Sequence, residues 1–216
     1  MNMAAHPKVK IRPYLTKNGW GFDVEIFSRE ATVADYLEAL ENVNKHFSLP
    51  CEGCGECCRG RLPLTLIDIF LLQEGLKGLT GKDFTLEDIL ERYCQVKVWR
   101  GAVDILLRTD AEGYCLFLYP SHRRCLLYPY RPLVCRTYYC LPQTRRARLL
   151  REQIINKGED ELVRVWLELC PYLPQGVERQ DWPPTPFAGC TGYHQVKLNK
   201  IVPPEFFTPS QEPASK

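Results

Sequence analysis

Four cysteines fall within eight residues of this chain, in the stretch Cys51-Glu-Gly-Cys54-Gly-Glu-Cys57-Cys58. Thiolates are the ligands that soft and borderline metals prefer, and a CxxC pair lets one backbone turn aim two sulfurs at one ion. The glycines at positions 53 and 55 permit the positive φ values that such a turn needs. Because Cys57 and Cys58 are adjacent, their side chains point in different directions in an extended chain. The loop therefore predicts a multinuclear metal site, or two sites that share the loop.

A second set of cysteines follows, at Cys115, Cys125, Cys135 and Cys140. The segments Tyr114–Leu118 and Arg124–Tyr128 are expected to form a hairpin closed by Tyr119–Arg123. The two sets together supply eight thiols, enough for two tetrahedral zinc sites or for one iron–sulfur cluster with further ligands. The competing interpretation is a set of buried apolar thiols, since free cysteine is among the most buried residue types. The spacing favours metal ligands.

The composition bears on whether these cysteines form disulfides. With 216 residues and 45% hydrophobic residues, the chain is long enough to bury a core without disulfides. Residues 1–11 lack the apolar run and cleavage site of a secretory signal. The apolar stretch Leu62–Leu72 contains polar residues and is shorter than the roughly 20 residues that span a bilayer. We therefore expect a cytoplasmic protein with no membrane contact, in which cysteines serve as metal ligands.

Hydrophobic periodicity and capping signals predict the elements that position the cysteines. Thr65 with Asp68, and Thr85 with Asp88, have the spacing of capping boxes at helix starts. Gly75 and Gly78 are expected to end the first of these helices. Gly158 is expected to separate the last two predicted helices, over 144–157 and 159–169. The expected elements are strands over 8–15 and 21–27, helices over 32–50, 66–74, 86–93, 144–157 and 159–169, and strand structure over 96–108 with a break at position 101.

These elements predict an α+β fold, with a small antiparallel β portion and about five short helices, pinned by the cysteine-rich metal site. We expect three regions: an N-terminal β hairpin over 1–31 that packs on the domain, a cysteine-cluster domain over 32–170, and a Pro-rich extension over 171–216. Nine of the 17 prolines fall in the last region, so it cannot be regular secondary structure throughout. Its aromatic residues indicate that part of it packs on the domain, and 208–216 is expected to be disordered.

The stretch from Gly113 to Arg151 contains eight arginines and no aspartate or glutamate. Because a thiolate-rich metal centre is anionic, guanidinium groups beside it are expected to lower thiol pKa values and hold the ligands in place. Arg131 and Arg136 flank Cys135 and are the best candidates for this role. The arginines over 145–151 lie on a predicted helix, where they are expected to face solvent or a protein or nucleic-acid partner.

The cysteine pattern, with the downstream pieces Cys115-Leu-Phe-Leu, Cys125-Leu-Leu-Tyr and Arg131-Pro-x-x-Cys135-Arg136, resembles the YkgJ-type cysteine-cluster family. That family is described as a zinc- or iron-chelating domain with eight characteristic cysteines. The resemblance covers about 51–140 and implies metal chelation without specifying a reaction. A flagellin lysine-N-methylase belongs to the same broader group, so the resemblance also admits an enzyme. The ligands that it implies are Cys51, Cys54, Cys57, Cys58, Cys115, Cys125 and Cys135, with Cys140 as the eighth.

Three functions follow from these observations: a zinc or iron–sulfur binding protein with a structural or redox metal, an enzyme that uses the metal centre, and a nucleic-acid adaptor. The chain has no GxGxxG, P-loop or HExxH motif. The net charge of +2 is low for a nucleic-acid binder. The binding protein is therefore favoured. Cys94, Cys170 and Cys190 lie outside the pattern and are expected to be packed thiols, and His122 is expected to be a solvated turn residue.

Overall fold

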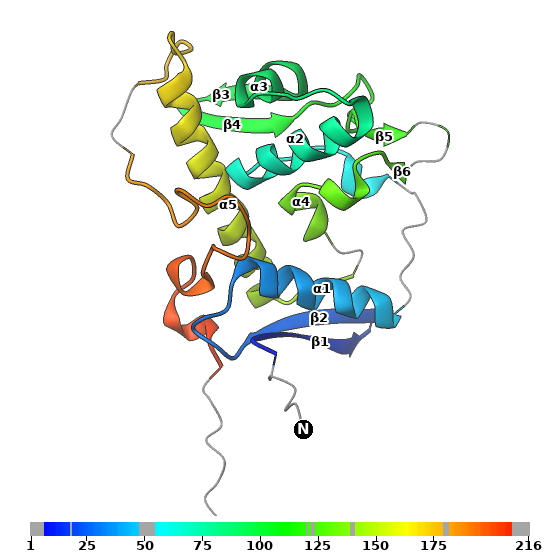
Figure 1. Cartoon of the computed structure of the whole chain (residues 1–216). Helices are drawn as coiled ribbons and strands as arrows, with labels where there is room; N and C mark the ends of the chain where they lie inside the picture. Colours follow the sequence, from blue (N-terminus) through cyan, green and yellow to red (C-terminus); the bar gives the residue numbers. More distant parts are fainter. Residues whose placement is uncertain are drawn as a thin grey trace, which may run out of the picture. The chain divides into compact units, whose positions relative to one another are not determined.

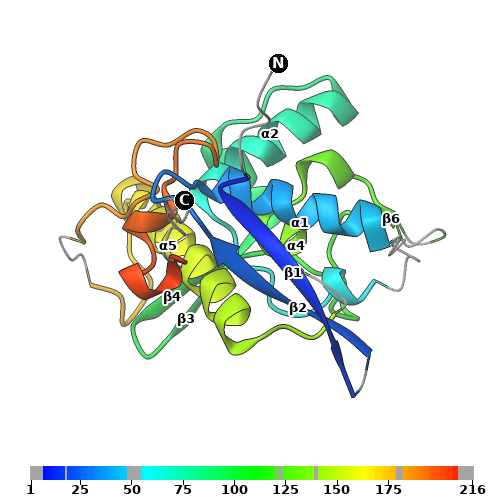
Figure 2. The same ribbon diagram turned by 90° about the horizontal axis from the view of Figure 1, so that it is seen from below.

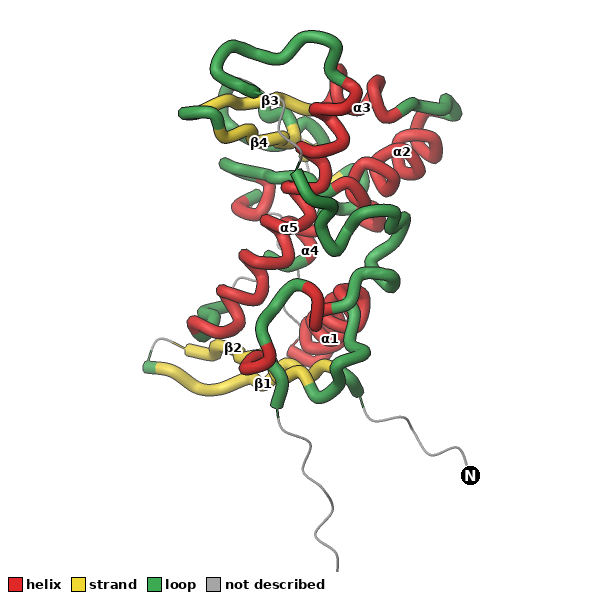
Figure 3. Tube along the Cα trace, turned by 90° about the vertical axis from the view of Figure 1, so that its left-hand side faces the viewer, coloured by secondary structure: helices red, strands yellow, loops and turns green. Residues whose placement is uncertain are grey.

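The computed structural model describes residues 7–17, 19–47, 55–119, 121, 124–138, 141–178 and 182–208. Within these ranges it contains five α-helices and three two-stranded antiparallel sheets, which confirms the α+β class (Figure 1). Figure 3 shows the strands confined to hairpins among helices and loops. The chain divides into two compact units, one of residues 1–50, 139–154 and 192–216, the other of 51–138 and 155–191. The region boundaries expected at 31 and 170 stay a prediction.

The first unit is built on the predicted N-terminal hairpin, formed by β1 (Val9–Thr16) and β2 (Gly19–Ile26). The strands are antiparallel, and the register pairs Val9 with Ile26. Alternate residues of β2 point inward, so Phe22, Val24 and Ile26 are buried and the carboxylates between them are partly exposed. Helix α1 (Val33–Phe47) lies beside the hairpin (Figure 2). It begins at Thr32, whose Oγ1 accepts a hydrogen bond of 3.2 Å from the Asp35 N–H.

The C-terminal segment packs on this first unit, as its aromatic residues indicated. Thr32 forms a bridge with Lys197, and Val196 and Leu198 are fully buried. The segment contains two short 3-10 turns, η3 (Leu198–Lys200) and η4 (Pro204–Phe206). The disorder expected over 208–216 falls outside the described residues except at Thr208, whose N–H donates to the carbonyl of Ile26 at 2.8 Å.

The second unit contains helices α2 (Leu66–Thr80) and α3 (Leu86–Tyr93) and a hairpin of β3 (Cys94–Trp99) and β4 (Ala102–Leu107). Both predicted capping boxes are present, with reciprocal side-chain and backbone hydrogen bonds at the first turn of each helix. The hairpin turns at Arg100 and Gly101, which both have positive φ. The strand break predicted at position 101 is therefore confirmed as a hairpin turn.

Two predicted helix ends are wrong. Helix α2 continues through Gly75 and ends only at Gly81, which has φ 70°. Helix α5 (Arg145–Leu169) is continuous where two helices were predicted. Gly78, the other predicted end of the first helix, also lies inside α2 and has nothing within 4 Å of an added Cβ. At Gly75 and Gly158 the reason is packing: a Cβ on Gly75 would lie 2.9 Å from Leu127, and one on Gly158 would lie 2.4 Å from Thr65. These glycines permit close approach of another segment and do not end a helix.

The remaining elements of the second unit are short and carry the cysteines. The hairpin predicted over 114–128 is confirmed, although its strands β5 and β6 have only two residues each. These elements are η1 (Glu56–Cys58), β5 (Leu118–Tyr119), β6 (Arg124–Cys125), η2 (Tyr128–Tyr130) and α4 (Leu133–Arg136). None of the described helices has the length and hydropathy needed to cross a bilayer.

Candidate metal centre

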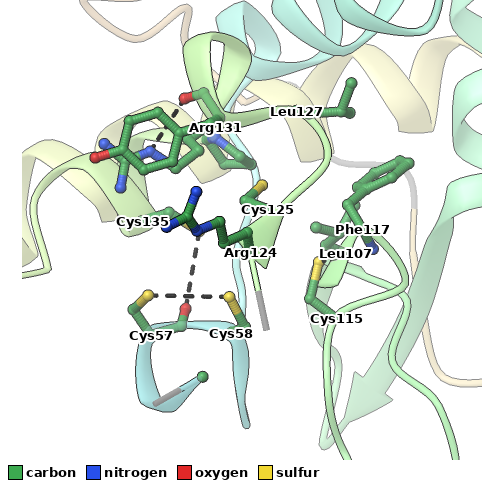
Figure 4. Close-up of a pocket in the computed structure, with 13 residues that line it drawn as sticks. Cys57, Cys58, Leu107, Cys115, Phe117, Arg124, Cys125, Leu127, Arg131 and Cys135 are labelled. Atoms are coloured by element: carbon green, nitrogen blue, oxygen red, sulfur yellow. Dashed lines mark hydrogen bonds between the residues drawn. The ribbon is translucent and has the colours of Figure 1, made fainter. Parts of the chain in front are cut away.

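Five of the eight predicted ligands line one cavity of about 380 Å³ in the second unit (Figure 4). They come from η1, from the segment before β5, from β6 and from α4, and they are Cys57, Cys58, Cys115, Cys125 and Cys135. The rest of the wall is mostly apolar and includes Leu107, Phe117 and Leu127. The other three predicted ligands, Cys51, Cys54 and Cys140, lie outside the described residues.

Backbone pairing fixes Cys58 next to Cys115. The η1 turn starts at Gly55, whose φ is 78° and whose carbonyl accepts a 2.9 Å hydrogen bond from the Cys58 N–H. The Cys58 carbonyl in turn accepts a hydrogen bond of 2.7 Å from the Cys115 N–H, and an antiparallel bridge between Arg59 and Tyr114 extends the pairing. These backbone hydrogen bonds hold Cys58 and Cys115 next to each other, although the two residues are far apart in the sequence.

Cys125 and Cys135 are positioned by different means. Cys125 pairs with Leu118 across the β5–β6 hairpin. Cys135 lies on the single turn of α4, and the N–H of Leu133 at its start donates a 2.8 Å hydrogen bond to Asp68 Oδ1. Asp68 is fully buried and its other oxygen accepts from the N–H of Thr65 at 2.8 Å. One carboxylate thus caps α2 and holds α4, and only the capping role had a sequence signal.

The Cys57 and Cys58 sulfurs lie 3.9 Å apart. The hydrogen bond from the Cys58 thiol is the main cause that lowers the pKa of Cys57 to about 6, with help from the positive charge of Arg131 and against the effect of burial. The same hydrogen bond, together with burial, raises the pKa of Cys58. The pair therefore favours ionisation of Cys57 over that of Cys58, and a thiolate is the form of cysteine that binds metals.

The pKa values of Cys115 and Cys135 are raised, whereas that of Cys57 is lowered. Burial raises the pKa of Cys115 to about 12, although the N–H of Phe117 donates to its sulfur at 3.4 Å. Burial also raises the pKa of Cys135, and charge on Cys115 and Cys57 adds to the effect. The Cys135 thiol donates to the carbonyl of Cys57 at 3.9 Å. Thiols that oppose one another's ionisation in this way need a cation among them in order to lose their protons.

Arginine side chains supply positive charge at the cavity wall. Arg131 lines the cavity, stacks on the Tyr128 ring at 3.8 Å and donates through Nε to the Tyr128 carbonyl at 3.1 Å. This arrangement fits the charge-compensating role expected of Arg131. Arg124 also lines the cavity. The number of arginines in this stretch gave no reason to select Arg124 among them. Arg136 is half-buried on α4 and is not one of the lining residues, so its role stays a prediction.

The donor chemistry of the cavity fits a metal such as zinc or iron, because five sulfurs and two guanidinium groups line one space. The described residues do not by themselves form the site, however. Among them, no three or more cysteine, histidine, aspartate or glutamate side chains are grouped closely enough to hold a metal ion. The metal pin that was part of the expected fold is therefore not seen in the described part of the chain, which does not include the predicted ligands Cys51 and Cys54.

The other cysteines are engaged outside the cavity lining. Cys94 is buried at the start of β3, and burial raises its pKa to about 12. The Cys170 thiol donates to the carbonyl of Tyr172 at 2.9 Å, and Cys190 donates to the carbonyl of Pro186 at 3.7 Å. These contacts agree with the prediction of packed thiols. His122 lies outside the described residues.

The arginine-rich stretch of α5 only partly matches its expected exposure. Arg145 and Arg148 are exposed, and Arg148 pairs with Glu152 at 3.8 Å. Arg146 was expected to face solvent or a partner, but it is half-buried and donates to the carbonyl of Phe206. It turns inward because the C-terminal segment of its own unit offers that carbonyl and an aromatic ring 6.0 Å from the guanidinium.

Comparison with known proteins gives a family match over the same region. Residues 50–153 match the family model CxxCxxCC, described as a "Putative zinc- or iron-chelating domain". No curated protein and no solved structure matches the chain.

Proposed function

We propose, on the premise that residues 50–153 are a domain of the CxxCxxCC family, that this protein binds zinc or iron in the cavity of its second unit. The ligands would be the five cysteines of the cavity together with Cys51, Cys54 and Cys140 of the sequence pattern. The metal would serve a structural or a redox purpose in a reducing cytoplasm, where thiols stay free to bind it.

The convergence of distant cysteines carries this proposal. Cys57 and Cys135 are 78 positions apart in the sequence, yet they line one cavity and share a hydrogen bond. Packing alone can bury a cysteine, but it gives no reason for five thiols from four separate segments to gather beside two arginines. Metal binding gives that reason, because thiolates bind zinc and iron strongly and the arginines offset their negative charge.

The chain's own residues would prepare the site for the metal. Among the five described cysteines of the cavity, Cys57 has a lowered pKa, so it would supply the first thiolate. The segments that bear the other ligands are held by η1, by the β5–β6 hairpin and by the contact between Asp68 and Leu133. A bound ion would cross-link these segments, which are each too short to be stable alone, and would thereby stabilise the second unit.

The choice between structural zinc and an iron–sulfur cluster belongs to the same proposal. Eight thiolates satisfy two tetrahedral zinc ions, whereas a cluster would leave some thiols as further ligands. The sulfurs of Cys57 and Cys58 lie 3.9 Å apart, close enough for both to bind one ion or for each to bind a different ion of a multinuclear centre.

The two alternatives from the sequence, a lysine-N-methylase-like enzyme and a nucleic-acid adaptor, have no observation in their favour. In the described part of α5, Arg146 is turned toward a backbone carbonyl and Arg148 lies near Glu152, so the helix lacks a continuous cationic face. We therefore limit the proposal to metal binding.

Serine variants of lining and non-lining cysteines test the proposal. Cys125→Ser is expected to lower the metal content of anaerobically purified protein, because Cys125 lines the cavity. Cys190→Ser is the matched control, since Cys190 is also half-buried but lies outside the cavity lining. Elemental analysis of both variants beside the wild type is the measurement. Equal metal content in all three proteins would contradict the proposal.

A further inference from the structure

A second hollow adjoins the cysteine-lined cavity. It is an open groove of about 560 Å³, lined by Tyr119, Arg124, Cys125 and Leu126. Arg124 and Cys125, the two residues of β6, line both hollows, so the two hollows meet at this strand. An occupant of the groove would therefore lie directly beside the proposed metal centre.

The groove carries large apolar side chains that water reaches. Tyr119 is 43% exposed and Leu126 46%, and Tyr128 at the adjoining cavity is 52% exposed. Tyr119 and Leu126 line the same groove, so one apolar side chain of a partner can contact both of them. Tyrosine and arginine are also the residue types that dominate the energetic centres of protein interfaces.

The charge around the groove has one sign. Arg124 lies in the groove and Arg131 lines the adjoining cavity. No acidic side chain lines either hollow within the described residues, and the sequence has no aspartate or glutamate from Gly113 to Arg151. A ligand that carries carboxylates as well as an apolar group therefore complements this surface.

We propose that the groove is a docking site for a segment of a partner protein that combines carboxylates with a large apolar or aromatic side chain. The apolar side chain would pack between Tyr119 and Leu126, and a carboxylate would pair with the guanidinium of Arg124. A nucleic acid fits this surface less well, because its affinity depends on many phosphate contacts and the two hollows offer two arginines. This partner site is additional to metal binding.

Three short peptides labelled with fluorescein test the proposed chemistry by fluorescence anisotropy against the full-length, metal-analysed protein. The first, Asp-Glu-Leu-Phe-Asp-Glu, carries both features; in the second the acidic residues are lysines, and in the third Leu-Phe is Ser-Ser. We expect the first to bind at least about tenfold more tightly than either of the others, since each lacks one of two required contacts.

Variants of the groove then assign the binding site. Leu126→Ser and Arg124→Gln are each expected to weaken binding of the first peptide about tenfold or more. The matched controls are Leu79→Ser, at an exposed leucine of α2, and Arg100→Gln, at the exposed β3–β4 turn, which are expected to leave the affinity unchanged. Metal content is measured for every variant. Leu126→Ser with normal metal content but weakened peptide binding would separate the docking surface from the metal site.

Three results would overturn the docking proposal. One is equal binding, or no binding, of all three peptides; another is an unchanged affinity in both groove variants. The third is tighter binding of a labelled oligouridine than of the first peptide, which would assign the surface to nucleic acid. Each of these results would leave the metal-binding proposal standing, because that proposal depends on metal content alone.

Discussion

Replacing Glu159 by glutamine is expected to change how the stability of the protein depends on pH. Glu159 lies on α5 and is only 5% exposed, and its Oε2 accepts a 2.8 Å hydrogen bond from Arg61. Its other oxygen, Oε1, is buried and has no hydrogen-bond partner among the described residues. Burial raises the pKa of Glu159 from an ordinary 4.5 to about 7; Arg61 opposes the increase, and the charge of Asp104 adds to it.

The size of the effect follows from the two pKa values. The folded protein holds a proton on Glu159 up to about pH 7, whereas the unfolded chain loses it near 4.5. The free energy of unfolding therefore decreases as the pH rises through this interval and is constant above it. At about 1.36 kcal/mol per pH unit, the whole interval corresponds to about 3 kcal/mol, of which about 2 kcal/mol falls between about pH 5.5 and about pH 8.

Urea unfolding of the wild type and of Glu159→Gln at several pH values measures this contribution. The contributions of the other titrating groups cancel when the free energy of unfolding of one protein is subtracted from that of the other, provided that the two proteins contain equal amounts of metal at each pH. We expect the stability of the wild type relative to the variant to decrease by about 2 kcal/mol between about pH 5.5 and about pH 8. Glu112→Gln, at an exposed turn residue, is the control and should follow the wild type. Parallel curves for wild type and Glu159→Gln would refute the reasoning.

Four further substitutions test the packing and the site. Gly158→Ala is expected to lower the free energy of unfolding by about 1–3 kcal/mol, because the added Cβ would lie 2.4 Å from Thr65, the N-cap residue of α2. At Gly78 an added Cβ has nothing within 4 Å, so Gly78→Ala is expected to raise the free energy of unfolding by up to about 1 kcal/mol. Asp68→Ala is expected to cost about 2–3 kcal/mol and to speed metal release to a chelator, since it leaves two N–H groups unpaired; unchanged release would contradict its role in holding α4. Arg131→Gln is expected to slow iodoacetamide labelling of Cys57 in metal-free protein near pH 6, where the thiolate fraction is most sensitive to the pKa, because the lost charge raises the thiol pKa; an equal rate would contradict the electrostatic role.

The features that the sequence predicted best are local ones. The capping boxes at Thr65 and Thr85 and the hairpin turn at Gly101 each depend on residues within a few positions of one another. The cysteine pattern predicted that the loop over 51–58 and the later cysteines belong to one metal-binding region, as a multinuclear site or as two sites, and five of the eight predicted cysteines line one cavity. Local hydrogen bonding and ligand spacing are therefore the parts of this fold that can be derived from sequence alone.

The features that could not be predicted depend on tertiary contacts. Gly75 and Gly158 were expected to end helices, but each lies within a helix where a neighbouring side chain approaches too closely for a Cβ. The hydrogen bond from Leu133 to Asp68 joins positions 65 apart, so no local pattern signals it. Arg146 was expected to be exposed, and only the folded C-terminal segment supplies the carbonyl that it binds.

Metal content of the intact protein tests the central claim most directly. The full-length chain is purified without oxygen, and the same sample is given to elemental analysis and to ultraviolet–visible spectroscopy. We expect at least about one zinc or iron per chain: about two zinc ions in a colourless protein, or iron with acid-labile sulfide and absorbance around 400 nm. A folded, reduced protein that contains neither metal, and takes up neither when each is supplied, would contradict the claim.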